Sequence, residues 1–145
     1  MTTTLRLLQA EDEEGWKAYH GIRRHVLFEL RGFDFYDEDH PDEHRQGHFP
    51  LLFSVDGVPT GTARLDILDD TEDGGIVKLV AIIPQRQGQG FGRTMMRAVE
   101  TFASARGIRR LEVYAAPDAV PFYQKQGWQH VRDTQQTVLL AKLID

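Results

Sequence analysis

The sequence contains no cysteine, which excludes a disulfide framework, cysteine-ligated zinc and a thiol nucleophile. It has no apolar run near the roughly 20 residues that a membrane-spanning helix needs. Met1 is followed by Thr-Thr-Thr-Leu-Arg, without a basic and then an apolar stretch, so no signal peptide is expected. Acidic residues outnumber basic ones by 22 to 17, which gives a net charge of −5, whereas nucleic-acid-binding domains usually carry a basic face. These absences predict a cytoplasmic protein that binds neither membrane nor nucleic acid.

The 145 residues are enough for one ordinary domain, so we expect a single domain over residues 1–145. Alternating or continuous apolar patterns predict strands at 4–9, 51–55, 60–68, 76–83, 111–115, 128–131 and 137–144. An Asp56-Gly57 turn predicts that the strands at 51–55 and 60–68 form a hairpin. Helical spacing and capping residues predict a helix that begins at Asp12, a second over 21–30 that Gly32 ends, a third over 91–105 and a fourth over 117–126. The strand at 76–83 is apolar on both faces, which favours a central position in a mixed sheet. The fold class is therefore α/β.

A glycine-rich turn joins the strand at 76–83 to the helix at 91–105, and it reads Gln87-Gly88-Gln89-Gly90-Phe91-Gly92. Glycines at a helix N-terminus let backbone N–H groups converge on a phosphate. A P-loop would need Lys-Ser/Thr after its last glycine, and this pair is missing. A Rossmann fingerprint would need a third glycine where the chain has Arg93. The turn is therefore a candidate phosphate site of a different type.

Two motifs resemble those of the GCN5-related N-acetyltransferase (GNAT) family. The pattern Gln87-x-x-Gly90-x-Gly92 resembles that family's acyl-CoA loop, and Ala119-x-x-Phe122-Tyr123-x-x-x-Gly127-Trp128 resembles its late Phe-Tyr motif. The order of strands and helices matches along nearly the whole chain. One departure is Ala116, where many relatives have an asparagine seven residues before the tyrosine; this puts one cofactor or substrate contact in doubt.

The resemblance implies a GNAT-like fold, with a mostly antiparallel sheet of about seven strands flanked by about four helices. It implies an N-acetyltransferase that carries an acetyl group from acetyl-CoA to a small-molecule or peptide amine, with a homodimer as one oligomeric option. The cofactor-binding residues that it implies are Val80, Ala81, Ile82, Arg86, Gln87, Gly88, Gln89, Gly90, Phe91, Gly92, Arg93, Phe122 and Tyr123. No resident metal is expected.

Three catalytic roles follow from the same resemblance. Tyr123 is the candidate general acid for the departing CoA thiolate, and the alternative is that it only packs beside Phe122. The Ile82 N–H is the candidate oxyanion donor. Glu29 is the favoured general base, with Asp37 to His40 also lining the acceptor pocket. Other carboxylates stay open as bases, and for Asp66 an ion pair with Arg64 is the preferred interpretation; these carboxylates are Asp37, Asp39, Asp66, Glu72 and Glu112.

The segment over residues 33–44 is acidic and aromatic and has no strand or helix period. It is predicted either as a solvated loop or as a substrate-facing loop, because carboxylates among aromatic rings can hold a cationic amine. A metal site at His40 and His44 is a weaker alternative, since the spacing matches no specific ligand pattern. A different class of function also stays open, namely an acyl-CoA-binding sensor without catalysis, which Ala116 and the lack of a clear base favour.

Overall fold

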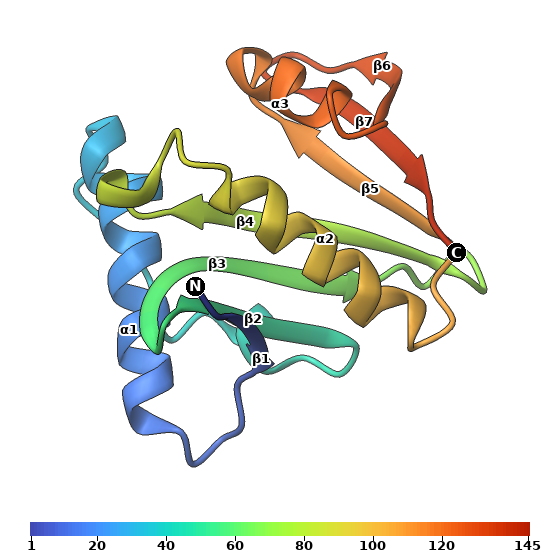
Figure 1. The fold of residues 1–145 in the computed structure, drawn as a ribbon. Coiled ribbons are helices and arrows are strands. Elements are labelled where there is room, and N and C mark those ends of the chain that lie inside the picture. Colours follow the sequence, from blue (N-terminus) through green and yellow to red (C-terminus); the bar gives the residue numbers. More distant parts are fainter.

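Seven strands form one sheet in the order β1-β2-β3-β4-β5-β7-β6 in the computed structural model, which describes residues 1–145. Only the β4–β5 pair is parallel, and all other neighbours are antiparallel. The strands are β1 Thr3–Leu7, β2 His48–Val55, β3 Val58–Ile67, β4 Gly74–Ile82, β5 Arg110–Ala115, β6 Gln129–Asp133 and β7 Val138–Leu143. The prediction of a mixed, mostly antiparallel sheet with the 76–83 strand at its centre is confirmed (Figure 1).

Three α-helices accompany the sheet: α1 Glu13–Arg23, α2 Phe91–Ser104 and α3 Val120–Gln124. Asp12 caps α1 as expected, because its carboxylate accepts a hydrogen bond from the Gly15 N–H at 2.9 Å. Short 3₁₀ turns precede α2 at Pro84–Arg86 and α3 at Pro117–Ala119. None of the helices has the length and apolar character needed to cross a membrane.

The separate second helix predicted over 21–30 is wrong. The Arg24 N–H donates to the carbonyls of His20 and Gly21, so the helical path runs on through Gly21 into a π-helical turn, Arg24–Phe28, and a 3₁₀ turn, Glu29–Arg31. The glycine leaves the hydrogen-bond ladder intact, and nothing else ends it there. Gly32, with φ of 83°, ends the segment where the sequence predicted a stop.

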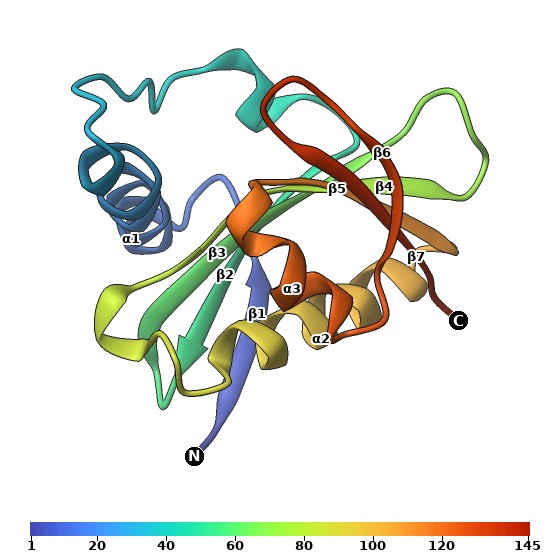
Figure 2. The same cartoon turned by 90° about the horizontal axis from the view of Figure 1, so that it is seen from above.

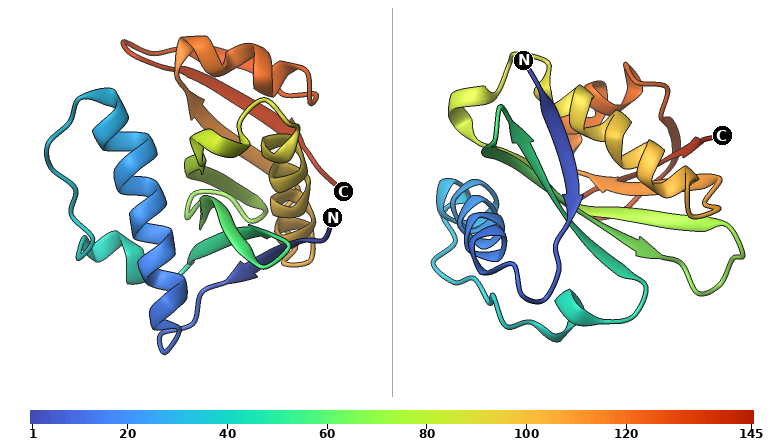
Figure 3. Two further views of the ribbon diagram at one scale, coloured as in Figure 1. Left: turned by 60° about the vertical axis from the view of Figure 1, so that its left-hand side comes forward. Right: turned by 60° about the horizontal axis from the view of Figure 1, so that its bottom comes forward.

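The two long helices cover opposite faces of the sheet (Figures 2 and 3). Under α2 lies the larger core, which includes Phe53, Leu65 and Met95. Under α1 lies a smaller core, built around Tyr19, Ile22 and Leu52. Leu51 and Phe53 belong to the first core and Leu52 to the second, as the alternation of side chains along a strand requires.

The β2–β3 hairpin turns at Asp56-Gly57, as predicted. Asp56 has φ of 50° and Gly57 has φ of 80°, the positive angles that a tight two-residue hairpin turn needs. The hairpin fixes the register that places Arg64 and Asp66 of β3 on one face.

The parallel strands β4 and β5 separate halfway along their length. They pair from Gly74 with Arg110 to Val77 with Val113, and no further. Just beyond, Leu79 has φ of 56°, and the β3–β4 register shifts between Thr62 and Arg64, which marks a bulge. Figure 1 shows β4 running on alone while β5 turns away from it. One edge of β4 is therefore free at the centre of the sheet.

Candidate active site

A cavity of about 700 Å³ opens at the place where β4 and β5 separate. Its walls come from five parts of the chain that are distant in sequence. The helical segment and the loop after it contribute Arg23, Leu27, Phe28, Arg31, Phe33, Phe35, Tyr36, Asp37, His40, Asp42 and Glu43, the sheet contributes Arg64, Val77, Lys78, Leu79, Val80, Val113, Tyr114 and Ala115, and the remaining wall is Ala116, Ala119, Tyr123 and Thr137. The sheet thus forms the floor, and the helical segment and the 33–43 loop face it.

The free edge of β4 presents backbone groups that have no strand beside them. The Ile83 N–H donates to the Thr60 carbonyl of β3 at 2.9 Å. Because backbone groups alternate in direction along a strand, the Ile82 N–H and carbonyl point to the other side, toward the gap. The Ile82 carbonyl already accepts a hydrogen bond from Gln87 Nε2 at 2.8 Å. Ile82 therefore presents its N–H on the edge where an added strand can pair.

The side chains of Val80 and Ala81, neighbours in β4, have different surroundings. Val80 lines the cavity, whereas Ala81 is buried in the small core beneath α1. The contribution of Ala81 to the free edge is therefore confined to its backbone.

The glycine-rich turn leads directly into the N-terminus of α2. Gly88 and Gly90 have φ of 74° and 85°, left-handed angles that glycine adopts without the clash of a Cβ atom. Gly90 is the N-cap and offers no side chain to the first amides of α2, so these N–H groups are available to an anion. Gln89 Nε2 donates a hydrogen bond to the Gln85 carbonyl at 2.9 Å, which ties the two ends of the turn together. Arg86 Cζ lies 5.5 Å from the centre of the Phe91 ring. Arg93 is exposed in the first turn of α2.

The structure brings the two sequence motifs into contact. A Cβ atom at Gly92 would lie 3.2 Å from the Phe122 ring, a tight contact that glycine avoids where α2 and α3 approach each other. Phe122 in turn packs edge-to-face on Tyr123, with ring centres 5.0 Å apart. The glycine turn and the tyrosine are therefore parts of one packed unit.

Tyr123 is held firmly at the cavity wall. Its side chain packs edge-to-face on Trp128 at 5.5 Å, and only 5% of the residue is exposed. Burial raises the pKa of Tyr123 to about 12. The hydroxyl therefore keeps its proton at neutral and mildly alkaline pH. Ala116, at the position of the departure noted in the sequence, lies on the same cavity.

The carboxylates proposed as bases are placed very differently. Asp66 is buried in an ion pair with Arg64, at 2.8 Å from Nε, as preferred from the sequence. Glu29 is exposed, lies 3.2 Å from His25 Nδ1, and is not among the residues that line the cavity. Glu112 pairs with Arg110. Asp37 lines the cavity, and its Oδ1 accepts a hydrogen bond from the Asp39 N–H at 3.0 Å.

The acidic segment 33–44 is both a cavity wall and a set of ion pairs. Glu38 contacts Arg24 at 2.8 Å and Asp42 contacts Arg45 at 3.0 Å, while Glu43 pairs with Arg23. Three of its six carboxylates are thus neutralised by arginines of the chain itself. No group of three or more histidine, cysteine, aspartate or glutamate side chains is arranged to hold a metal ion, at His40 and His44 or elsewhere.

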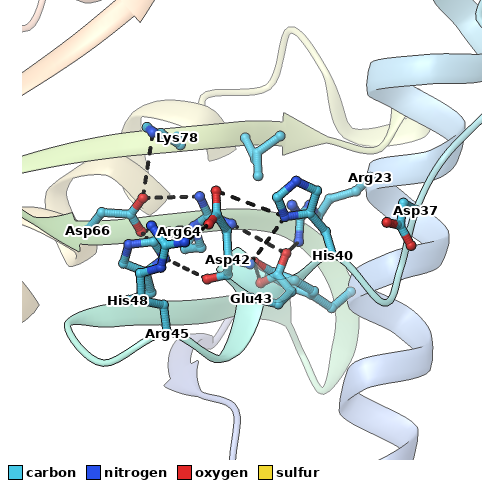
Figure 4. Close-up of polar contacts among 12 residues, drawn as sticks. Arg23, Asp37, His40, Asp42, Glu43, Arg45, His48, Arg64, Asp66 and Lys78 are labelled. Carbon is cyan, nitrogen blue, oxygen red and sulfur yellow. Dashed lines mark hydrogen bonds and ion pairs between the residues drawn. The ribbon is translucent and has the colours of Figure 1, made fainter.

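A buried charge network forms the polar end of the cavity, and the sequence predicted only its Arg64–Asp66 pair (Figure 4). Glu43 accepts hydrogen bonds from Arg23 and, at 3.1 Å, from the Tyr19 hydroxyl, and it lies 3.6 Å from Arg64 Nη1. Asp66 joins Arg64 and lies 3.8 Å from Lys78 Nζ. The available signal was Arg23 itself, which stands four residues after Tyr19 and therefore on the buried face of α1.

Comparison with known proteins identifies the family to which the chain belongs, and the matched residues include both motifs. The model of the acetyltransferase (GNAT) family matches residues 9–128. Mouse N-alpha-acetyltransferase 80 is 39% identical over 72 residues, which are 50% of this chain and 23% of that protein. A Bacillus subtilis (strain 168) protein classed as an acetyltransferase is 29% identical over 115 residues, covering 74% of this chain and 72% of its own. The match thus spans only a small part of the mouse relative.

Solved structures show the same fold over the full length. A protein from Lactobacillus plantarum classed as an N-acetyltransferase has a TM-score of 0.82 at 20% identity and covers 100% of both chains. The PaiA N-acetyltransferase from Thermoplasma acidophilum, solved in complex with coenzyme A, has a TM-score of 0.75 at 15% identity and covers 99% of both chains.

Proposed function

Since the chain belongs to the acetyltransferase (GNAT) family, we propose that it transfers an acetyl group from acetyl-CoA to the amine of a small molecule or peptide. The observation that carries this proposal is the position of Tyr123, at the wall of a cavity that opens on the free edge of β4. The gap between β4 and β5 supplies the cofactor side of the site, and the helical segment with the 33–43 loop supplies the acceptor side.

Acetyl-CoA would lie along the turn and the free strand edge. The N–H groups of residues 87–93 would hold the pyrophosphate, because the helix N-terminus has free donors and a positive dipole end. The pantetheine amides would pair with the edge at Val80 to Ile82, as an added strand does. A structural neighbour of the same fold, the PaiA enzyme, binds coenzyme A.

Transfer would proceed by direct attack of the amine on the thioester. The nitrogen–carbon bond forms, the carbon–sulfur bond breaks, the amine gives up a proton to a base or water, and CoA leaves as a thiolate that takes up a proton. The Ile82 N–H faces the edge where the carbonyl oxygen would lie, and it would stabilise the charge that develops there. No covalent enzyme intermediate is needed.

Tyr123 would donate to the departing sulfur. Its pKa of about 12 lies above the reference value of about 8.5 for a thiol, so complete transfer of its proton to a free thiolate would be uphill. A strong hydrogen bond to the sulfur as charge develops is the role that this environment favours. The buried hydroxyl stays protonated between turnovers.

The proton of the amine would pass to Asp37, directly or through water. Asp37 is the candidate carboxylate that lines the cavity without an ion-pair partner, and Figure 4 shows it apart from the charge network. Glu29 stays a second prediction for this role. The roles of the individual residues, the single domain over 1–145, the cytoplasmic location and the homodimer remain predictions as well.

Replacement of Tyr123 by phenylalanine tests the proposal. We expect acetyl-CoA to bind with unchanged affinity in calorimetry, while kcat for CoA release falls by about 10²-fold, the usual worth of a proton donor. An unchanged kcat would exclude Tyr123 as the donor. Acetyl-CoA binding without turnover of any amine by the wild type would favour the sensor function, and absence of acetyl-CoA binding would overturn both.

A further inference from the structure

The polar end of the cavity carries more positive than negative charge. Arg23, Arg64 and Lys78 contribute three cations, whereas Glu43 and Asp66 contribute two carboxylates. Both arginines and both carboxylates are at most 5% exposed, whereas the Lys78 side chain is 46% exposed, so the third cation is the one within reach of a ligand. Among these five side chains, one positive charge is therefore left without a carboxylate of its own.

One buried donor of this network has no partner. Arg23 Nε is shielded from solvent and makes no hydrogen bond, although Arg23 lines the cavity and is 4% exposed. A buried donor without an acceptor costs free energy of about 1–3 kcal/mol, and such groups are rare in folded proteins. Lys78, from β4, has its ammonium 3.8 Å from Asp66 Oδ2, and its side chain is 46% exposed at the cavity. An acceptor oxygen in the cavity would pair with the Lys78 ammonium, and a shift of the Arg23 side chain would bring its Nε to the same oxygen.

We propose that the acetyl acceptor is an amine that also carries a carboxylate, bound by Arg23 and Lys78 at the polar end of the cavity. This inference rests on the proposed acetyl transfer for the identity of the ligand as an acceptor. The excess of one positive charge matches a carboxylate, which is a monoanion, better than a doubly charged phosphate or an additional cation such as a polyamine. A guanidinium and an ammonium in a buried site are also the groups that hold carboxylates in charge-assisted hydrogen bonds.

The rest of the cavity indicates which carboxylated amine fits. Phe28 packs edge-to-face on Phe33, Phe35 and Tyr36, with ring centres 5.0 to 6.2 Å apart. Phe33 and Phe35 are 51% and 68% exposed at this wall, so the cluster offers uncovered apolar surface next to the polar end. An amino acid with an apolar or aromatic side chain would cover these rings while its carboxylate reaches the cations. This combination makes phenylalanine a suitable probe.

The test compares ligands that differ only in the carboxylate. N-acetylphenylalanine and N-acetylphenylalaninamide resemble the product of transfer, and their dissociation constants can be measured by calorimetry without turnover. Phenylalanine and phenylalaninamide are the matching acceptors in the CoA-release assay. The amide has the less basic amine, so more of it is unprotonated at the assay pH, which works against the expected preference.

We expect the acid of each pair to be favoured by about tenfold or more, in affinity and in kcat/KM, because the neutral amide does not balance the excess positive charge of Arg23, Arg64 and Lys78. The variant Lys78→Gln should reduce this ratio to about threefold or less, and Arg23→Lys should lower it too, since the charge stays but Nε is lost.

Lys78 is half exposed, so its loss should leave the thermal midpoint nearly unchanged. Lys17→Gln removes the same charge from the exposed side of α1 and should leave the ratio as in the wild type.

Equal binding and turnover of acid and amide, preference for the amide, or no binding of either product at millimolar concentration would each overturn the inference. The first two outcomes would leave acetyl transfer intact if any amine is acetylated. Selective binding of the acid together with no turnover of any amine would support the anion site and contradict the proposed transferase function. An unchanged ratio in Lys78→Gln would also contradict the assignment of that residue.

Discussion

Glu43 is the side chain on which the buried charge network depends most. It is 3% exposed, accepts hydrogen bonds from Tyr19 and Arg23, and lies 3.6 Å from Arg64. Replacement of Glu43 by glutamine keeps the shape but leaves two buried guanidinium groups without their shared counter-charge. We expect the free energy of unfolding to fall by about 3–5 kcal/mol, the usual effect of removing one partner of a buried ion pair. Urea denaturation of the purified variant measures this change.

Glu38 provides the matched control for that substitution. It also forms an ion pair with an arginine of the helical segment, at 2.8 Å from Arg24, but the side chains are 51% and 42% exposed. Exposed pairs contribute at most about 1 kcal/mol, so Glu38→Gln should change stability by less than that. If both variants lost similar stability, burial would not be what makes the Glu43 pairs important.

The contact between α2 and α3 couples the cofactor turn to Tyr123. Replacement of Gly92 by alanine puts a Cβ atom 3.2 Å from the Phe122 ring, and that ring packs on Tyr123. Alanine normally favours a helix by up to about 1 kcal/mol over glycine, which offsets part of the crowding. We therefore expect little change in thermal midpoint but a fall in kcat of about tenfold, because Phe122 and Tyr123 must shift. The CoA-release assay and a thermal melt of the same preparation test both parts.

Gly21 allows the same substitution without the contact. It lies within α1, and a Cβ atom there would meet no other atom within 4 Å. Gly21→Ala should raise stability by about 0.5–1 kcal/mol, or about 2–4 °C in the thermal midpoint, and leave kcat unchanged. A loss of activity in Gly21→Ala equal to that in Gly92→Ala would show that the helix substitution itself, and not the Phe122 contact, is responsible.

Residues that cap a helix or form a turn correctly predicted where their own helix or hairpin begins or ends. Asp12, the Asp56-Gly57 turn and Gly32 act through their own backbone or neighbouring amides, so their effect can be read from a few residues. Gly21 misled the prediction because a glycine ends a helix only when it takes a left-handed angle, and here the hydrogen bonds continue through it. The continuity of that segment depends on its packing against the sheet, which the local pattern does not contain.

The candidate site likewise has one part that local sequence signals predict and one part that they do not. The glycine turn and the Phe122-Tyr123 pair are short motifs, and they were predictable because their residues are close in sequence. The acceptor side joins Arg23, Glu43, Arg64 and Lys78 from four separate segments, and no spacing in the sequence relates them. The acidic segment 33–44 suggested a site for a cation, but Glu38 and Glu43 meet Arg24 and Arg23, which only the tertiary fold places beside them.

The two cores of the molecule each bury tyrosine hydroxyls, which ties its stability to alkaline pH. Burial raises the pKa of Tyr123 to about 12 and, in the smaller core, raises that of Tyr19 far above its ordinary value. In the unfolded chain these groups lose their protons near pH 10. The stabilisation is therefore complete below about pH 10 and is lost as the pH rises from there toward about 12, because only the unfolded state gives up protons in that window.

Tyr123→Phe isolates one of these groups and makes the alkaline effect measurable. The free energy of unfolding of the wild type should fall between about pH 10 and 12, and the variant should fall less steeply, by about 1 kcal/mol per pH unit. Urea denaturation at several pH values from about 9 to 11.5 gives both slopes, and lysines that titrate in this range contribute equally to the two proteins. Equal slopes would mean that the Tyr123 hydroxyl gives up its proton as readily in the folded protein as in the unfolded chain. In that case burial would not hold the donor in its protonated form, and the proposed role of Tyr123 toward the leaving sulfur would lose its physical basis.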